Sequence, residues 1–218
     1  MPRSNRWNRF IYACWAPFYD FFVQAPLIIR ARGRAIEELA LQPGQRVCLI
    51  GVGTGADFPF LPKGLRVEAV DLSPAMLAKA RRKLPVPGCD IALSQANAED
   101  LPFPAQTFDA AFLTLILSVA SDGPACMREA VRIVRPGGRL LVLDKFLAPD
   151  TSPSPARRIL NLLTRFFGTD INRSFETLTA GLPVRVVSDR PALLRGTYRT
   201  IVLTRLAESP SSSRTGGL

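Results

Sequence analysis

Residues 48–56 read CLIGVGTGA, a short apolar run that ends in three closely spaced glycines. Glycines are needed where the backbone turns sharply and passes close to a ligand at the carboxyl end of a parallel strand. A second apolar strand pattern ends at Asp71, twenty residues after Gly51. A carboxylate at that spacing can accept hydrogen bonds from the two hydroxyls of a ribose. Together the two features indicate an α/β fold that binds a nucleoside.

This stretch alone does not identify the nucleoside. Gly51, Gly53 and Ala56 also satisfy the relaxed dinucleotide pattern G-x-G-x-x-A, which keeps an NAD enzyme as an alternative. A pyrophosphate binds best at the N-terminus of a well-formed helix, but residues 57–62 read DFPFLP and place two prolines where that helix would run. Asp57 would also repel a phosphate, whereas it would tolerate a sulfonium or an amino group. The stretch therefore favours a positively charged ligand.

Helical and extended patterns alternate along the chain from residue 26 to residue 146. Such alternation predicts a parallel sheet with helices on both faces, which is a doubly wound, Rossmann-like α/β fold. Pro26 and the pair Ser73-Pro74 are typical of helix starts. The expected helices span residues 26–41, 74–84 and 123–134, and the expected strands span residues 46–51, 65–70, 91–95, 109–113 and 139–143.

The last third of the chain departs from this alternation. Residues 156–167 form an amphipathic helical pattern, with arginines away from its apolar side. Two further strands, at 184–187 and 198–203, predict an antiparallel hairpin at the edge of what is then a seven-stranded sheet. The Ser- and Gly-rich residues 208–218 are expected to be a flexible tail. The expected domains are an N-terminal helical segment or lid over residues 1–41, a ligand-binding domain over residues 42–207, and that tail.

The composition limits the chemistry that the protein can perform. The chain of 218 residues is 47% hydrophobic, enough for a full core, and contains no histidine. A Ser-His-Asp triad, a histidine general base and most transition-metal sites are therefore excluded, and we expect no bound metal. The four cysteines lie far apart without a C-x-x-C pair, which predicts a reducing compartment and no disulfide framework. Carboxylates, tyrosine, lysine or a cofactor remain as the acting groups.

The positive charge is concentrated at the two ends of the sequence. The 28 Lys and Arg outnumber the 18 Asp and Glu, but residues 47–146 hold 11 basic against 10 acidic side chains. A nucleic-acid binder can have basic flanks, yet no zinc finger, RNA-recognition motif or recognition helix stands out, and we expect no nucleic-acid partner. Basic flanks also suit a surface that faces anionic lipid. A soluble protein that is simply basic is the alternative.

An aromatic-rich segment lies beside arginines near the N-terminus. An apolar run over residues 10–29 follows Arg3, Arg6 and Arg9, but Asp20 and two prolines interrupt it, which argues against a membrane-spanning helix. The segment suits an interfacial helix or a lid over a pocket. Packing of its aromatic side chains on the domain core is the alternative.

Four motifs in order resemble the class I S-adenosylmethionine-dependent methyltransferases. They are VCLIGVGTGA at residues 47–56, Asp71 with SPAML at 73–77, QANAEDLPFP at 95–104 with TFD at 107–109, and EAVRIVRPGGRL at 129–140. The resemblance covers about residues 46–146 and implies the family's seven-stranded sheet, whose final pair forms a hairpin. It also implies S-adenosylmethionine as the cofactor and S-adenosylhomocysteine as the product.

The same resemblance implies which residues bind the cofactor. The glycines of the loop would pass close to the methionine part, Asp71 would hold the ribose, and the residues after the second and third strands would surround the adenine. The implied set is Gly51, Gly53 and Gly55 for the methionine part, Leu72 or Met76 packed on the adenine, Asn97 and Ala98 at the adenine edge, and Thr114 at the end of the fourth strand.

Within the family, the wording of these motifs is most similar to two branches that act on lipids. They are the C-methyltransferases of ubiquinone and menaquinone synthesis and the bacterial phospholipid N-methyltransferases, and both commonly carry a Tyr-Asp pair ahead of the glycine loop, here Tyr19-Asp20. After the fourth strand the quinone branch typically shows Gly-Leu-Arg-Asn, whereas residues 116–119 read ILSV. A deprotonated amine attacks unaided, but carbon methylation of a quinol needs a base, which suits a chain without histidine less well.

We therefore expect N-methylation of a phospholipid headgroup amine, such as that of phosphatidylethanolamine. Quinone C-methylation, methylation of a soluble small molecule, and a cofactor-binding module without catalysis are the alternatives. Tyr19 would bind the amine or its methylammonium, and Asp144 or Lys145, at the end of the fifth strand, would border the acceptor pocket. Tyr12 and Tyr198 are weaker candidates. We expect a cytoplasmic monomer that docks on the inner face of the cell membrane through its N-terminal segment and residues 156–167.

Overall fold

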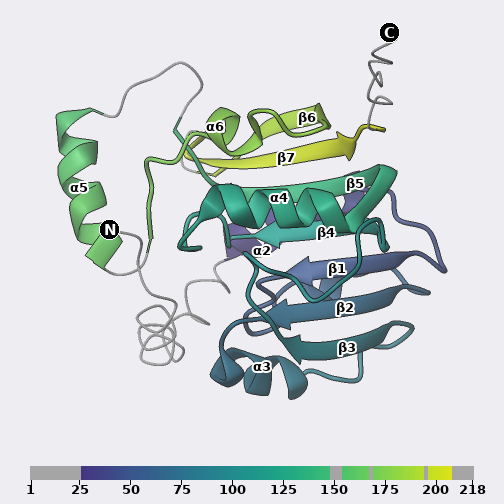
Figure 1. The fold of residues 1–218 in the computed structure, drawn as a ribbon. Helices are drawn as coiled ribbons and strands as arrows, with labels where there is room; N and C mark the ends of the chain where they lie inside the picture. Colours follow the sequence, from purple (N-terminus) through teal and green to yellow (C-terminus); the bar gives the residue numbers. More distant parts are fainter. Residues whose placement is uncertain (1–25, 148–153, 167–168, 194–195, 208–218) are drawn as a thin grey trace, which may run out of the picture.

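A seven-stranded sheet in the order β3-β2-β1-β4-β5-β7-β6 forms the centre of the protein (Figure 1). The structure is a computed structural model that describes residues 26–147, 154–166, 169–193 and 196–207. Strands β1 to β5 are parallel, and β7 is antiparallel to both β5 and β6. The strands are β1 (Arg46–Ile50), β2 (Arg66–Asp71), β3 (Asp90–Gln95), β4 (Phe108–Thr114), β5 (Val134–Lys145), β6 (Val184–Leu193) and β7 (Tyr198–Arg205). The expected sheet with its antiparallel final pair is confirmed.

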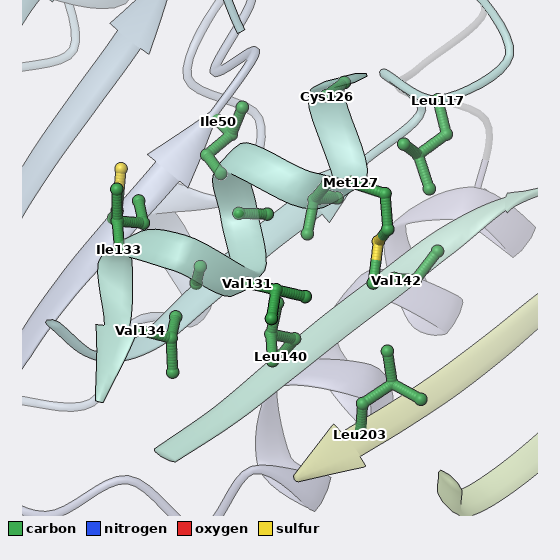
Figure 2. Packing of buried hydrophobic residues seen from close by; sticks show 14 of the residues in the cluster. Ile50, Leu117, Cys126, Met127, Val131, Ile133, Val134, Leu140, Val142 and Leu203 are labelled. Carbon is green, nitrogen blue, oxygen red and sulfur yellow. The ribbon is translucent and has the colours of Figure 1, made fainter. Parts of the chain in front are cut away.

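Helices cover both faces of this sheet, as expected for a doubly wound fold. The described helices are α2 (Pro26–Glu38), the short 3-10 helix η1 (Phe58–Phe60), α3 (Pro74–Arg81), α4 (Gly123–Ile133), α5 (Pro155–Phe166) and α6 (Phe175–Thr179). Helix α4 lies on one face and α2 on the other (Figure 1). Met127 and Val131 of α4 pack against Leu140 and Val142 of β5 in one buried cluster (Figure 2). The burial of both faces explains the apolar runs at residues 47–50 of β1, 110–113 of β4 and 140–143 of β5.

Helix α2 belongs to the second buried cluster. Its Ile36, together with Leu39 just beyond its end, packs with Val47 and Leu49 of β1, and all four side chains are at most 3% exposed. The remainder of the expected N-terminal segment, residues 1–25, lies outside the described residues, as does the expected tail. Within the described ranges, no helix has the length and apolar character that crossing a bilayer requires.

Side-chain caps fix where two helices begin beside the sheet. Ser73 caps α3 because its hydroxyl accepts a hydrogen bond from the N–H of Met76, and a proline occupies the first turn, as the sequence predicts. Asp122 caps α4, where its carboxylate accepts from the N–H of Ala125 at 2.8 Å. Both helices therefore start close to the carboxyl ends of the strands that precede them.

Several boundaries differ from the sequence-based expectations. Helix α2 ends at Glu38 instead of near residue 41, because the chain turns there and Ala40 adopts a φ of 46°. Strand β5 starts at Val134, directly after α4, and runs through Gly137, which has a φ of 76°. The sequence predicts this strand only over residues 139–143.

The remaining differences lie near the C-terminus and in α3. Helix α3 ends at Arg81 instead of near residue 84. Strand β6 continues to Leu193, and two register shifts keep it paired with β7. Helix α6 was not expected, because five residues are too few to display a helical period.

Candidate functional site

The carboxyl ends of β1 to β5 meet at one edge of the sheet (Figure 1). Ligands of open α/β sheets bind outside this edge. The structure brings every predicted cofactor residue to it, because each one ends one of these strands or follows within a few residues. We call this edge the ligand edge and define it by residues 51–57, 71–76, 97–98, 114–118 and 144–145.

The loop after β1 tolerates no side chain at two of its glycines. Gly51 and Gly55 have φ angles of 71° and 72°, a region that favours glycine. A Cβ atom on Gly51 would lie 2.8 Å from the side chain of Ile116, and a Cβ atom on Gly55 would lie 2.5 Å from the ring of Phe58. The loop therefore presents bare backbone at the ligand edge, as close approach to a ligand requires.

The carboxylate of Asp71 links this loop to the end of β2. Its Oδ2 accepts a hydrogen bond from the N–H of Gly53, and its Oδ1 accepts one from the N–H of Ser73, both at 2.8 Å. Burial raises the pKa of Asp71, and the backbone N–H groups of Ser73, Gly53 and Leu72 act in the opposite direction. Each carboxylate oxygen has a second lone pair, so Asp71 can also accept from ligand hydroxyls. Its role in holding the loop was not predicted from the sequence.

Thr54, at the centre of the glycine loop, has a polar group without a partner. Its side chain is 1% exposed, and its hydroxyl makes no hydrogen bond with the described residues. Buried hydroxyls are normally hydrogen-bonded, so an orphan at a ligand edge indicates a group that the ligand satisfies. The bare loop backbone, the open lone pairs of Asp71 and the Thr54 hydroxyl fit S-adenosylmethionine, whose ribose and amino acid parts are polar.

The residues expected around the adenine differ in accessibility. Met76 is 2% exposed and belongs to the buried side of α3, whereas Leu72 is half-buried and accessible at the ligand edge. Ala98 is also half-buried. The side-chain oxygen of Asn97 accepts from the N–H of Glu99 at 3.1 Å and so closes a tight turn. Thr114 ends β4 with 6% of its surface exposed.

Asp144, which is expected to border the acceptor pocket, has both carboxylate oxygens bound by backbone N–H groups. The side chain is completely buried at the end of β5. Its Oδ2 accepts from the N–H of Ser118 at 2.9 Å and its Oδ1 from the N–H of Lys145 at 2.7 Å. Burial raises the pKa of Asp144, and the charge of Lys145 opposes that rise. Asp144 therefore fixes the loop after β4, and its place at the acceptor pocket stays a prediction.

Lys145 and Tyr198 lie against one another across the β5–β7 pair. The Nζ atom of Lys145 lies 5.7 Å from the centroid of the Tyr198 ring. Burial lowers the pKa of Lys145, and burial also raises the pKa of Tyr198 to about 12. Because Tyr198 is only 5% exposed, its ring is unavailable to a substrate cation. Tyr19 and Tyr12 lie outside the described residues.

A buried ion pair that the sequence did not predict joins α2 to the glycine loop. Arg32 donates to the carboxylate of Asp57 at 2.5 Å. The charge of Asp57 is therefore already matched, and the expected repulsion between Asp57 and a phosphate is not available to select the ligand. One signal existed in the sequence: Arg32 lies four residues from both Ile28 and Ile36, on the apolar face of the helix.

Helix α5 stands beyond the ligand edge (Figure 1). It is anchored by polar groups: Asn161 donates to Asp170 at 3.0 Å and accepts from the N–H of Ile171 at 2.7 Å. Arg157 donates to the carbonyl oxygens of Phe146 and Ile171. Arg157 therefore faces the protein, and its charge does not belong to the outer surface of the helix that we expected to meet a membrane.

The apolar side chains of α5 that can be described face outward. Ile159 is 67% exposed and Leu162 is 72% exposed, whereas Asn161 is 7% exposed. Large apolar side chains of a surface helix are usually buried, and these two are exceptions. Arg158 is also exposed. The outer surface of α5 thus combines large apolar side chains with a positive charge.

The anchor of α5 continues to the loop that follows β4. The N–H of Asp170 donates to the carbonyl oxygen of Ser118 at 2.7 Å. Arg173 donates to the carbonyl oxygens of Leu117 and Ala120. Because Ser118 also holds Asp144, the outer helix and the end of β5 are connected by a short path of hydrogen bonds. Within the described ranges, no group of three His, Cys, Asp or Glu side chains could hold a metal ion.

Comparisons with known proteins define the class. A family model described as a methyltransferase domain matches residues 49–142. A phosphatidylethanolamine N-methyltransferase of Cereibacter sphaeroides is 33% identical over 153 residues, which cover 68% of this chain and 74% of that protein. The chain therefore belongs to the S-adenosylmethionine-dependent methyltransferases, and its cofactor is S-adenosylmethionine.

Two further similarities place the chain within that class. A ubiquinone/menaquinone biosynthesis C-methyltransferase of Vibrio cholerae is 39% identical over 119 residues, which cover 51% of this chain and 45% of that protein. Among solved structures, a geranyl diphosphate methyltransferase in complex with S-adenosylmethionine matches with a TM-score of 0.69 at 18% identity. That match covers 82% of this chain and 85% of the other. At this identity, it supports the fold.

Proposed function

We propose that the protein N-methylates the headgroup amine of a phospholipid, such as phosphatidylethanolamine, at the surface of an anionic membrane. The observation that carries this proposal is the outward apolar surface of α5, with Ile159 and Leu162 67% and 72% exposed, beside the ligand edge. Apolar side chains mixed with positive charge are typical of helices that lie in a membrane interface.

The first turn of α2 also exposes apolar side chains. Leu27 is 65% exposed and Ile29 is 36% exposed, and Arg30 next to them is exposed as well. Arg32, one turn further along, contacts Asp57 of the glycine loop, which places the start of α2 near the ligand edge. Both α2 and α5 thus expose apolar and basic side chains, which supports contact with a lipid surface.

Methyl transfer from S-adenosylmethionine requires mainly that the protein place the two reactants correctly. S-adenosylmethionine, when bound, supplies a methyl group that its sulfonium already activates. The glycine loop and Asp71 would hold it, and the ligand edge has to orient the amine in line with that methyl group and exclude water. An ammonium headgroup must first lose a proton. Lys145, half-buried at the end of β5, is the side chain that we expect to border the amine at this edge.

Quinone C-methylation is the second candidate, because relatives named for that activity are as similar to the chain as the phospholipid enzyme is. A quinol also resides in the membrane, so the surface of α5 would serve both substrates. The absence of histidine favours the amine, since an aromatic carbon becomes nucleophilic only after a base removes the quinol proton.

The test supplies the protein with labelled S-adenosylmethionine and three vesicle preparations. The first contains phosphatidylethanolamine with phosphatidylglycerol, the second contains demethylmenaquinol in phosphatidylcholine with phosphatidylglycerol, and the third contains phosphatidylcholine with phosphatidylglycerol alone. We expect label in the phospholipid fraction of the first preparation only. Label confined to the quinone fraction would establish the second candidate, and label in neither fraction would overturn both.

A further inference from the structure

The ion pair between Arg32 and Asp57 lies beside the glycine loop and is almost fully buried. Both side chains are 5% exposed. Asp57 follows Gly55 by two residues and precedes η1, but its side chain does not cap that helix. The Asp57 carboxylate is instead directed at α2, a helix that starts more than twenty residues before it in the chain.

A second contact joins α2 to the same loop. A Cβ atom on Gly33 would lie 3.1 Å from the ring of Phe60, so the helix backbone rests against η1. The neighbouring ring of Phe58 lies against Gly55. The glycine loop is thus held against α2 by two adjacent contacts, one ionic and one through aromatic rings.

Stability alone does not account for this ion pair. Removing two charges from water costs several kcal/mol for each ion, and apolar residues of similar volume often replace a buried pair without loss of stability. Arg32 occupies a position between Ile28 and Ile36 where an apolar side chain would complete the buried stripe of α2. What an ion pair adds is a fixed direction and distance between the two elements, because leaving either charge unpaired is strongly unfavourable.

We propose that Arg32 is a positioning residue for the cofactor, and that through Asp57 it holds the glycine loop in the conformation that binds S-adenosylmethionine. Arg32 does not touch the cofactor in this role. The loop bears Thr54, whose buried hydroxyl has no hydrogen-bond partner in the part of the chain that the structure describes. It also bears Gly53, whose N–H is bound by Asp71, so a displaced loop would misplace both groups. The proposal concerns the cofactor half of the site and does not depend on which acceptor is methylated.

The test compares cofactor affinity with folding in the variant R32M/D57N, which removes both charges and nearly keeps the side-chain volumes. We expect a melting temperature within about 5 °C of wild type, because no charge is left unpaired. The dissociation constant for S-adenosylmethionine, measured by calorimetry, should rise at least about tenfold, since small misplacements of binding groups are costly. Hydrogen exchange of the amides of residues 53–57 in the ligand-free protein should become faster.

A folded double variant with the wild-type dissociation constant and wild-type exchange would overturn the proposal. If R32M/D57N does not fold, R32K decides in its place: lysine keeps the charge but not the planar fork, and the dissociation constant should rise about threefold or more. An R32K variant that binds S-adenosylmethionine with the wild-type dissociation constant would then also overturn the proposal.

The control is Arg190→Met, which breaks the ion pair that Arg190 makes with Glu38 at the other end of α2. That pair is largely exposed and remote from the loop, so we expect cofactor affinity to stay unchanged. A loss of affinity as large as in R32M/D57N would assign the effect to general loosening of α2 and contradict a specific role of Arg32.

Discussion

Asp71 combines two functions in one side chain. Its two oxygens fix the N–H groups of Gly53 and Ser73, and each oxygen keeps a lone pair that can accept from a ligand hydroxyl. Asp71→Ala should therefore weaken S-adenosylmethionine binding about 10- to 150-fold, since a hydrogen bond to a charged group contributes about 1.5–3 kcal/mol. Asp71→Asn keeps one acceptor oxygen, so its dissociation constant should lie between those of wild type and Asp71→Ala. Calorimetry measures both, and an unchanged dissociation constant in Asp71→Ala would refute the ribose assignment.

Gly55 tests whether the loop depends on contact or on backbone conformation alone. Gly55→Ala adds a Cβ atom 2.5 Å from Phe58 at a φ of 72°, whereas Gly181→Ala adds one at a φ of 73° with nothing within 4 Å. Both changes carry about 1–2 kcal/mol of backbone strain. Only Gly55→Ala should also lower cofactor affinity. Thermal melts and calorimetry on both variants separate the two effects, and equal affinities would mean that the contact with Phe58 is unimportant.

At the scale of elements, α5 is expected to be the part that meets the membrane. Ile159→Glu with Leu162→Glu places two charges on its outer surface, where they disturb no described contact. Sedimentation with phosphatidylglycerol vesicles should fall at least about tenfold, because burial of each side chain contributes about 1.5–3 kcal/mol. Cofactor affinity should not change.

Val187→Glu is the matched control for this experiment. Val187 lies on β6 and is 54% exposed, comparably to the two residues of α5. Its neighbours Val186 and Ser188 pair with Leu203 and Val202, in the half of β7 that points away from the ligand edge. Vesicle binding that falls as far in Val187→Glu as in the α5 variant would contradict a docking surface on α5.

Glu129 and Arg132 form an ion pair within α4, and hydrogen bonds of both side chains hold the loop after β3. Glu129 accepts from Arg132 and from the N–H of Leu101, and Arg132 lowers the pKa of Glu129. Because the pKa of Glu129 is lower in the folded protein than in the unfolded chain, its charge stabilises the fold at pH values above its unfolded pKa. This stabilisation is lost as the pH falls through the folded pKa.

Glu129→Gln should therefore melt below wild type at pH 7, and the difference in melting temperature should shrink between about pH 5 and pH 3. Other carboxylates titrate in both proteins, so their effects cancel in the difference. Circular dichroism melts over this range provide the measurement. A difference that stays constant with pH would show that Glu129 stabilises the fold through something other than its charge.

For the whole molecule, the most reliable predictions from the sequence concern features that depend only on residues close together in the chain. The glycine spacing, Asp71 and the Ser73-Pro74 cap are local signals, and parallel strands bring their carboxyl ends to one edge without further information. The pairing of Arg32 with Asp57 was not predictable in this way, because it links a helix to a loop after the next strand. The same reason applies to the hydrogen bond between Ser118 and Asp144, which joins the loop after β4 to the end of β5.

The orientation of α5 shows a second limit. An amphipathic pattern indicates that a helix has two unlike faces, but it does not say which face the protein covers. Here Asn161 and Arg157 find carbonyl and carboxylate partners on the neighbouring segment, and these contacts turn Ile159 outward. Only the three-dimensional arrangement separates Arg157, which anchors the helix, from the exposed Arg158.

The proposal that the whole molecule works at a lipid surface is tested most directly by surface dilution. Methyl transfer to phosphatidylethanolamine is measured at a constant bulk concentration of that lipid, while phosphatidylcholine and phosphatidylglycerol lower its fraction in the vesicle surface at a fixed proportion of anionic lipid. An enzyme that docks and then samples headgroups in the plane should slow as the surface fraction falls. A rate that follows only the bulk concentration, or no methylated phospholipid at any surface fraction, would contradict the account.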